Sequence, residues 1–219
     1  ALGIRSCDIV FAGGKKSFLK HPLIDNSSQI VYVHANDYDF FLEHRNRDKI
    51  KTNTEFAVFI DQNLAFNTDP KITGTGKVVT EKNYFPSLVN FFDQIEKINN
   101  IKVIIAAHPR ANYKDRPNIY GKREIVFGKT LELVRDSKII LVHYSNAINF
   151  AILFKKPILC FTTKELDSSF RKPAVDSLAS ELNKKVYNID VDRNIDLSAE
   201  LVIDNNLYKT YKEDYIKIK

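Results

Sequence analysis

Six short apolar runs, each followed by a longer polar or helix-periodic segment, constrain the fold of this chain most strongly. Most of these runs are apolar throughout instead of alternating, which is typical of parallel strands covered on both faces. Strands that alternate with helices indicate βα units, and six of them in order fit a doubly wound, Rossmann-like α/β sheet with strand order 3-2-1-4-5-6. The runs are Phe56–Asp61, Lys102–His108, Glu124–Gly128, Ile139–His143, Pro157–Thr162 and Val186–Asp190.

The segments between the runs predict helices with one apolar face. Pro86 suits the first turn of a helix, because the N–H that it lacks would have no partner there. The apolar residues that follow it are spaced by three and four, as on one helix face. Thr130 and Ser145 are candidate N-caps of two later helices, the second covering Ala147–Phe154.

The C-terminal third predicts further helices. We expect at least one within Lys164–Lys185, interrupted near Pro173, and an amphipathic helix over Leu207–Lys219. The apolar stripe of this last helix consists of Tyr208, Tyr211, Tyr215 and Ile216.

Residues 1–54 do not belong to the same pattern. They contain two strand-like runs, Cys7–Ala12 and Ile30–Ala35, a helix expected from Asp37 to about Arg45, and then a polar linker. Two strands cannot form an independent core. We therefore expect residues 1–54 to be the end of a preceding domain or extra strands docked on the main sheet, with residues 55–219 forming the Rossmann-like domain. The chain starts at Ala1 and has no methionine, so we expect a fragment of a longer protein.

Composition limits the class of protein. Hydrophobic residues make up 44% and charged residues 27%, as in soluble globular proteins. No apolar run approaches the roughly 20 residues that span a bilayer, and no signal peptide is visible. Cys7 and Cys160 each lie in an apolar run that predicts a buried strand, which favours a reduced, cytoplasmic protein. The net charge of +6 comes from scattered lysines, and no nucleic-acid-binding motif accompanies them, so we expect no nucleic-acid partner.

The residues at the carboxyl ends of the strands carry the functional signal, because ligands of doubly wound sheets bind there. The second strand ends in His108-Pro109-Arg110, and Pro109 forces His108 into an extended conformation. His108 could donate a hydrogen bond to a departing phosphate oxygen or protonate it, and the Arg110 fork suits phosphate or carboxylate. The alternative is that His108 only caps the strand end.

The fourth strand ends in Tyr144-Ser145-Asn146, where a helix is expected to begin. A helix N-terminus carries free N–H groups and suits phosphate, and Ser145 and Asn146 add side-chain donors. We expect this turn to face His108 across the crevice between neighbouring strands. The alternative is that Ser145 is only an N-cap.

Three other strand ends give weaker candidates. Gly128, Lys129 and Thr130 follow the third strand and could approach a phosphate, while Asp61 and Thr163 could reach a sugar or ribose. The alternative is that all of them are ordinary turn residues, since polar residues are expected in turns anyway. We expect no metal site, since the histidines are scattered and Asp190-Val191-Asp192 is the only Asp-x-Asp pair at the carboxyl end of one of the six runs. Gly13-Gly14-Lys15-Lys16-Ser17 lacks the spacing of a phosphate-binding loop.

The segments "KVIIAAHPR" and, some thirty residues later, "SKIILVHYSNAINFAILFKKPIL" resemble the C-terminal half of GT-B glycosyltransferases. They are similar, more narrowly, to bacterial enzymes with an HP motif: the sialyl-, polysialyl-, Kdo and polyol-phosphate transferases of surface polymers. The resemblance covers about residues 55–190. It implies that His108 contacts the donor phosphate, that Ser145 binds phosphate with Asn146 beside it, and that no cofactor is needed.

The resemblance implies a cytoplasmic transferase, with peripheral association at the inner membrane face left open. It would move a sugar from a nucleotide-sugar donor, CMP- or UDP-linked, to a glycan acceptor of a surface polysaccharide. The base of such enzymes normally lies on the N-terminal domain, where only Asp37 and Asp39 are stand-ins. The alternatives are a nucleotide-sugar epimerase of similar architecture and a non-catalytic module that binds a nucleotide or a partner.

Overall fold

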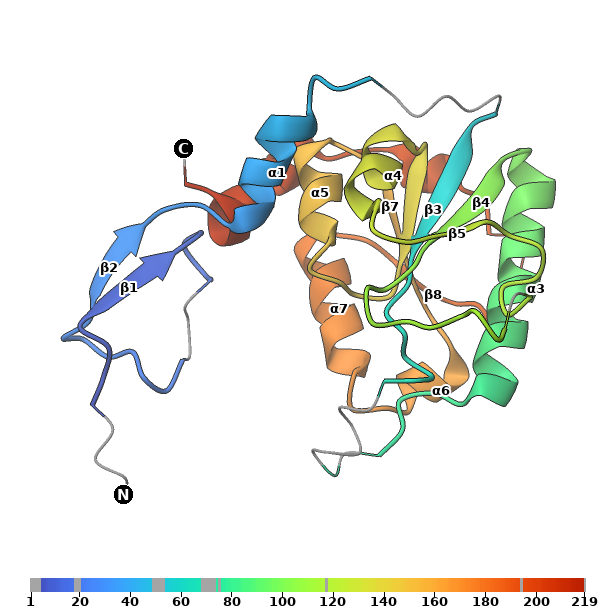
Figure 1. Cartoon of the computed structure of the whole chain (residues 1–219), viewed down its shortest axis with the longest axis horizontal. Coiled ribbons are helices and arrows are strands. Elements are labelled where there is room, and N and C mark those ends of the chain that lie inside the picture. The colour runs from blue at the N-terminus through green and yellow to red at the C-terminus, as the bar shows by residue number, and fades with distance from the viewer. Residues whose placement is uncertain are drawn as a thin grey trace.

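The computed structural model describes residues 5–17, 21–48, 54–67, 74, 76–116, 118–193 and 195–218. Its centre is a parallel sheet of six strands in the order β5-β4-β3-β6-β7-β8, which confirms the predicted 3-2-1-4-5-6 arrangement (Figure 1). The strands are β3 (Phe56–Ile60), β4 (Lys102–Ala106), β5 (Ile125–Val126), β6 (Ile139–Val142), β7 (Ile158–Thr162) and β8 (Val186–Asn188).

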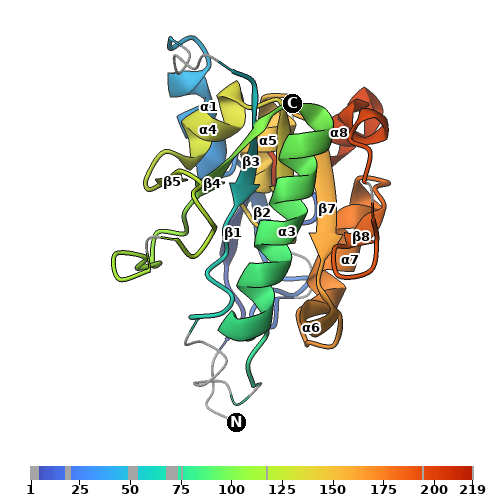
Figure 2. The ribbon, with the colours of Figure 1, turned by 90° about the vertical axis from the view of Figure 1, so that its right-hand side faces the viewer.

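Apolar side chains cover both faces of the sheet and form two cores. In β3, Phe59 packs into one core and Val58 into the other, because successive side chains of a strand point to opposite faces. Helix α3 (Glu81–Asn99) covers the first face, and Figure 2 shows it in front of the sheet, running roughly along the strands. The second face is covered by α4 (Thr130–Asp136), α5 (Ile148–Leu153) and the C-terminal helices. This two-sided burial explains why the strands are apolar throughout.

Helix α3 begins five residues before Pro86, so the prediction that Pro86 lies in the first turn was wrong. The earlier start depends on a distant carboxylate. Glu165 accepts hydrogen bonds from the backbone N–H and the hydroxyl of Thr80 and from the side-chain amide of Asn83, each at 2.7 Å. A tertiary contact of this kind satisfies donors at the helix start that the local sequence leaves open.

Neither predicted N-cap on the second face was right. Helix α4 starts at Thr130 itself, after Lys129, and no side chain caps it. Helix α5 starts at Ile148, because Ser145 and the two residues after it form a separate turn closed by the bond from the Ile148 N–H to the Ser145 carbonyl. The Ser145 hydroxyl instead accepts the N–H of Ala147 at 3.2 Å.

The predicted interruption in the next segment is confirmed. Helix α6 (Lys164–Asp167) is separated from α7 (Lys172–Glu181), and Pro173 lies in the first turn of α7, where its missing N–H costs nothing. Beyond the 3-10 helix η1 (Ser198–Leu201), the tail forms α8 (Asn205–Tyr211) and the π-helix η2 (Lys212–Ile216). Its predicted apolar stripe packs on the second core through Tyr208, Tyr211, Tyr215 and Ile216.

The N-terminal segment forms a separate unit beside the main sheet (Figure 1). Strands β1 (Ile9–Ala12) and β2 (Gln29–Tyr32) pair in parallel in a sheet of their own, so they are not strands of the main sheet. Helix α1 (Asn36–His44) then packs against α4 and α5. Residues 49–53, in the predicted linker, lie outside the described residues.

The cysteine predictions had different outcomes. Cys160 is buried in β7, as expected. Cys7 is exposed and lies two residues before β1, so the prediction that it lies in a buried strand was wrong. Among the residues that the structure describes, no helix combines the length and the apolarity that crossing a bilayer requires.

The turn after β1 contacts the C-terminal helix η2. Lys15 and Lys16 form ion pairs with Glu213 and Asp214, both at 2.6 Å. Gly14 packs so closely on the backbone of Asp214 that a Cβ there would lie 2.4 Å from its carbonyl. The turn of Gly13, Gly14, Lys15 and Lys16 therefore connects the N-terminal unit to the C-terminal helix η2.

Candidate functional site

A cleft of about 740 Å³ lies over the carboxyl ends of β3, β4 and β6. The chain winds from β3 toward β5 in one direction and from β6 toward β8 in the other, so the cleft lies at the topological switch point where such sheets bind ligands. Strands β4 and β6 are not neighbours, contrary to our prediction, because β3 runs between them. The cleft is lined by Gln62, Leu64, Asn67, His108, Tyr144, Ser145, Asn146, Arg171, Ala174, Ser177, Leu178, Glu181, Tyr211 and Tyr215.

His108 is half-buried at the end of β4 and lines the cleft. Its Nδ1 atom accepts the backbone N–H of Arg110 at 3.1 Å. A nitrogen that accepts carries no hydrogen, so the neutral ring bears its proton on Nε2. No residue that the structure describes bonds to Nε2, which leaves this N–H as a donor for a ligand in the cleft. Arg110 itself is exposed and is not among the lining residues.

Asp61, at the end of β3, lies beneath the cleft and not in it. It is 3% exposed and accepts the backbone N–H groups of Asn63 at 2.8 Å and His108 at 3.2 Å. The hydroxyls of Tyr113 and Tyr120 donate to it at 2.6 and 2.9 Å. Burial, with the charge of Asp61, raises the pKa of both tyrosines, so both remain donors. Asp61 therefore holds the His108 turn in place instead of pointing toward a sugar.

The Tyr144-Ser145-Asn146 turn lies opposite, after β6. The backbone N–H of Tyr144 approaches the side-chain oxygen of Gln62 at 3.4 Å, and the guanidinium of Arg171 lies 5.9 Å from the Tyr144 ring. Ser145 and Asn146 also line the cleft. The structure thus brings four predicted residues, His108 and the three residues of this turn, into one cleft.

The remaining predicted residues lie outside the cleft lining. Gly128, Lys129 and Thr130 follow the edge strand β5, where Gly128 adopts a φ of 69°. Thr163 is buried and caps α6 by accepting the N–H of Leu166 at 3.2 Å.

Both aspartates of Asp190-Val191-Asp192 accept backbone N–H groups. Asp190 accepts the backbone N–H of Lys164 at 2.7 Å, and Asp192 accepts that of Asn188 at 2.8 Å. Within the described ranges, no group of three or more His, Cys, Asp or Glu side chains is placed to hold a metal ion.

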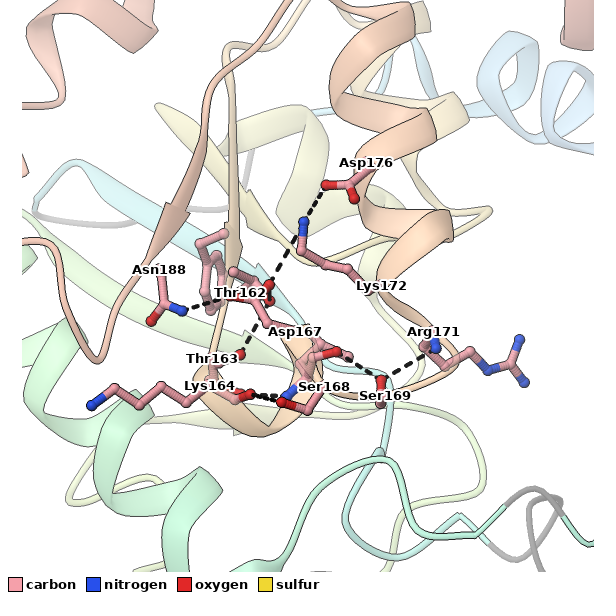
Figure 3. A network of polar contacts seen from close by, with 12 residues as sticks. Thr162, Thr163, Lys164, Asp167, Ser168, Ser169, Arg171, Lys172, Asp176 and Asn188 are labelled. Carbon is pink, nitrogen blue, oxygen red and sulfur yellow. Dashed lines mark hydrogen bonds and ion pairs between the residues drawn. The ribbon is translucent and has the colours of Figure 1, made fainter.

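A polar network at the end of β7 positions Arg171 (Figure 3). The carboxylate of Asp167 accepts hydrogen bonds from Thr162 at 2.9 Å and from Asn188 at 2.6 Å, and it lies 3.6 Å from the ammonium of Lys172. These contacts join β7, β8 and the start of α7. The side chain of Arg171 points away from this network, as Figure 3 shows, and lines the cleft.

The wall of the cleft contributed by α7 and the C-terminal tail was not predicted from the sequence. It includes Arg171, Glu181, Tyr211 and Tyr215, and the Tyr215 hydroxyl donates to Glu181 at 2.7 Å. The two tyrosines had a sequence signal, the apolar stripe, but that signal indicates packing. No local pattern distinguished Arg171 or Glu181 from solvent-facing helix residues.

His143, the residue before the cleft turn, is fully buried and uncharged. Its Nδ1–H donates to the Phe161 carbonyl at 2.7 Å, and its Nε2 accepts the hydroxyl of Tyr84 at 2.9 Å. Burial lowers the pKa of His143 to about 4. The unfolded chain binds this proton near pH 6.5, so the contribution of His143 is complete above that pH and is lost as pH falls toward 4.

We expect His143→Asn to reduce the acid sensitivity of folding. Wild-type stability should fall by roughly 3 kcal/mol between about pH 6.5 and pH 4 through this group, while the variant should lack this component of the slope. Urea unfolding at several pH values, compared between the two proteins, measures the difference. Parallel pH profiles would show that His143 is not the titrating group.

The fold and the cleft together define a doubly wound, Rossmann-like α/β domain with a polar cleft at its switch point. No protein-family model matches the sequence, and no curated protein matches it either.

Several solved structures are similar to parts of this chain. The wall teichoic acid polymerase TagF has 13% identity and a TM-score of 0.44, over 94% of this chain and 51% of that one. The glycotransferase of kitacinnamycin has 11% identity and a TM-score of 0.43, over 78% and 43%. The UDP-GlcNAc 2-epimerase of Methanocaldococcus jannaschii has 13% identity and a TM-score of 0.42, over 93% and 53%.

The chain thus spans about half the length of these proteins. Likeness at this level does not transfer a function, so the function of this chain is inferred from its own cleft.

Proposed function

We propose that the cleft binds a nucleotide-sugar donor and that this chain is the donor-binding part of a glycosyltransferase. The observation that carries the proposal is the meeting of two strand-end turns, His108 and Tyr144–Asn146, with Arg171 at the switch point of the sheet. A nucleotide sugar combines a phosphate-bearing group with many hydroxyls. The cleft offers a cation, neutral donors and a carboxylate, Glu181, that could accept from hydroxyls.

In this proposal, His108 acts on the phosphate that departs when the sugar is transferred. Negative charge grows on that oxygen in the transition state, and a preorganised donor lowers the barrier without reorganising water. The Nε2–H of His108 is such a donor, because the Arg110 N–H holds the other ring nitrogen as an acceptor. Arg171 would add positive charge, and Ser145 and Asn146 would bind the phosphate oxygens.

The proposed acceptor is a glycan of a surface polysaccharide. We assign no catalytic base to it. Asp37 accepts the side-chain amide of Asn149 at 2.7 Å, Asp39 lies 2.9 Å from His34, and neither aspartate lines the cleft. The residues of the cleft therefore support the donor side of the reaction, which is the part that we propose for this chain.

A panel of CMP-, UDP-, GDP- and CDP-linked ligands tests donor binding. A ligand at about 100 times its dissociation constant should stabilise the fold by roughly 2.7 kcal/mol, and we expect a CMP- or UDP-linked compound to do so. Thermal unfolding measures the shift. Arg171→Ala should reduce it, whereas Arg110→Ala, outside the cleft lining, should change it less.

The same panel separates the proposal from its alternatives. No shift with any of the four classes would contradict nucleotide binding and would favour a module that binds a partner. Conversion of the donor to its epimer without any acceptor would contradict sugar transfer in favour of an epimerase.

A further inference from the structure

A second pocket, separate from the cleft, lies among α1, α5, α8 and η2 and has a volume of about 420 Å³. None of its residues takes part in the proposed donor site. Its apolar residues are Tyr38, Phe41, Ile152, Leu153 and Tyr208, and its polar residues are Lys155, Asn205, Asn206, Lys209 and Lys212.

The polar residues of this pocket are cationic or neutral. In the part of the chain that the structure describes, Lys155, Lys209 and Lys212 take part in no ion pair, and no carboxylate lines the pocket. Lys212 and Lys217 also lie over the ring of Tyr38, at 5.6 and 4.5 Å. Several positive charges beside an apolar cavity raise the local concentration of anions.

The acidic side chains next to pocket residues along the chain have partners outside the pocket. Glu213, beside Lys212, pairs with Lys15 at 2.6 Å, and Asp39, beside Tyr38, lies 2.9 Å from His34. Asp204, just before α8, accepts the N–H groups of Asn206 and Leu207 at 2.8 and 3.1 Å. Asp37, on α1, accepts the amide of Asn149. Asp204 thus also occupies the free N–H groups at the start of α8, so an anion in the pocket would depend on the lysines.

Lys155 adopts a backbone conformation that disfavours lysine. It ends α5 with a φ of 51°, and the other described non-glycine residues with positive φ are asparagines. The N–H of Lys156 bonds to the Ala151 carbonyl at 2.8 Å and that of Lys155 to the Ile152 carbonyl at 3.2 Å. Helices that end in this way usually carry glycine or asparagine at the left-handed position. A lysine there sacrifices stability and places a positive charge at the pocket, which points to a role for its side chain.

We propose that this pocket binds an anionic phospholipid at a membrane surface. The lysines would contact the headgroup phosphate, and the apolar floor would contact the first methylene groups of the lipid. Lysine is a flexible point charge that suits a phosphate at variable depth, and tyrosine is favoured where one end of a site is apolar and the other wet. A soluble nucleotide is a poorer fit, because the described residues that line the pocket include no arginine and the start of α8 is already capped.

Vesicle flotation with the full chain tests the proposal. We expect binding to vesicles of equimolar phosphatidylglycerol and phosphatidylcholine, and little to vesicles of phosphatidylcholine alone. Lys155→Asn keeps a residue suited to positive φ and removes the charge, so it should weaken binding about fivefold. Lys102→Asn removes an exposed lysine at the start of β4 and serves as the matched charge control.

A second pair of variants separates strain from binding. Lys155→Gly should raise the Tm by about 2–4 °C and still weaken vesicle binding. Asn183→Gly changes another left-handed helix end, at α7, away from the pocket. It should leave vesicle binding unchanged. Loss of binding together with a rise in Tm would occur only if the lysine charge matters and its backbone conformation is unfavourable.

Other results would overturn the proposal. It fails if phosphatidylglycerol vesicles do not bind, if phosphatidylcholine binds equally, or if Lys155→Asn behaves like Lys102→Asn. Displacement of the protein from vesicles by millimolar inorganic phosphate, at constant ionic strength, would show a simple anion site and would also overturn it. None of these outcomes depends on a nucleotide sugar, so the donor-site proposal stands or fails separately.

Discussion

Replacing His108 with alanine should lower the rate of sugar transfer by the complete enzyme by about 10²–10³-fold. The ring offers a single N–H to the cleft, since its Nδ1 atom is occupied by the Arg110 N–H. Alanine removes that donor without opening the core, because the side chain is half-exposed and the Asp61 bond is made by the backbone of residue 108. We therefore expect a large loss of turnover, and an unfolding midpoint close to that of the wild type.

His108→Gln is the matched control for this experiment. Its amide can place an N–H near the position of Nε2, so part of the activity should return if His108 acts as a neutral donor. Activity that stays lost in glutamine would favour a role for His108 as an acid, because glutamine cannot give up a proton. Turnover of the alanine variant near the wild-type rate would contradict any role for His108 in the reaction.

Arg135→Ala should destabilise the protein by roughly 3 kcal/mol or more. Arg135 is 7% exposed and forms a bidentate pair with Asp136, both bonds at 2.8 Å. It also donates to the carbonyls of His44 at 3.0 Å, Arg47 at 3.3 Å and Asp48 at 2.8 Å. In the variant, the buried carboxylate of Asp136 loses the guanidinium of Arg135. The carbonyls at the end of α1 and just after it lose a hydrogen-bond donor, and both losses reduce stability.

Urea unfolding measures the stability, and limited proteolysis shows where the effect lies. Since Arg135 joins the end of α1 to α4, its loss should speed cleavage within residues 45–48. Arg123→Ala is the matched control: its side chain is equally buried and pairs with Asp93 and Glu96 at 2.5 and 2.6 Å, within the main domain. Arg123→Ala should lower stability without selective cleavage after α1. Equal cleavage patterns would contradict the specific role of Arg135.

Arg135 also shows what sequence patterns did not reveal. It lies in a short helix whose apolar positions are clear, yet nothing local indicates that its side chain satisfies carbonyls about 90 residues earlier in the chain. Glu165, which fixes the start of α3, is a comparable case. Long-range polar contacts of this kind depend on which helix ends meet, and that is decided by packing.

Part of the candidate site was predictable from the sequence, and part depended on how the helices pack. His108 and the Tyr144 turn follow buried strands, and parallel strands end at one edge of a sheet, so their meeting could be expected. Asp61 follows such a strand too, but Tyr113 and Tyr120 draw its carboxylate inward. Arg171 and Glu181 reach the cleft only because α7 packs beside β7.

The sequence by itself determined the six parallel strands, their order and the edge at which a ligand would bind. These follow from two-sided burial and right-handed crossovers, which act through local hydrophobic runs and chain order. Only the tertiary structure decided the helix starts, the separate sheet of residues 9–32, the far wall of the cleft and the lysine pocket among α1, α5 and α8. Each of these depends on side chains that are distant along the chain and become neighbours only when the helices pack.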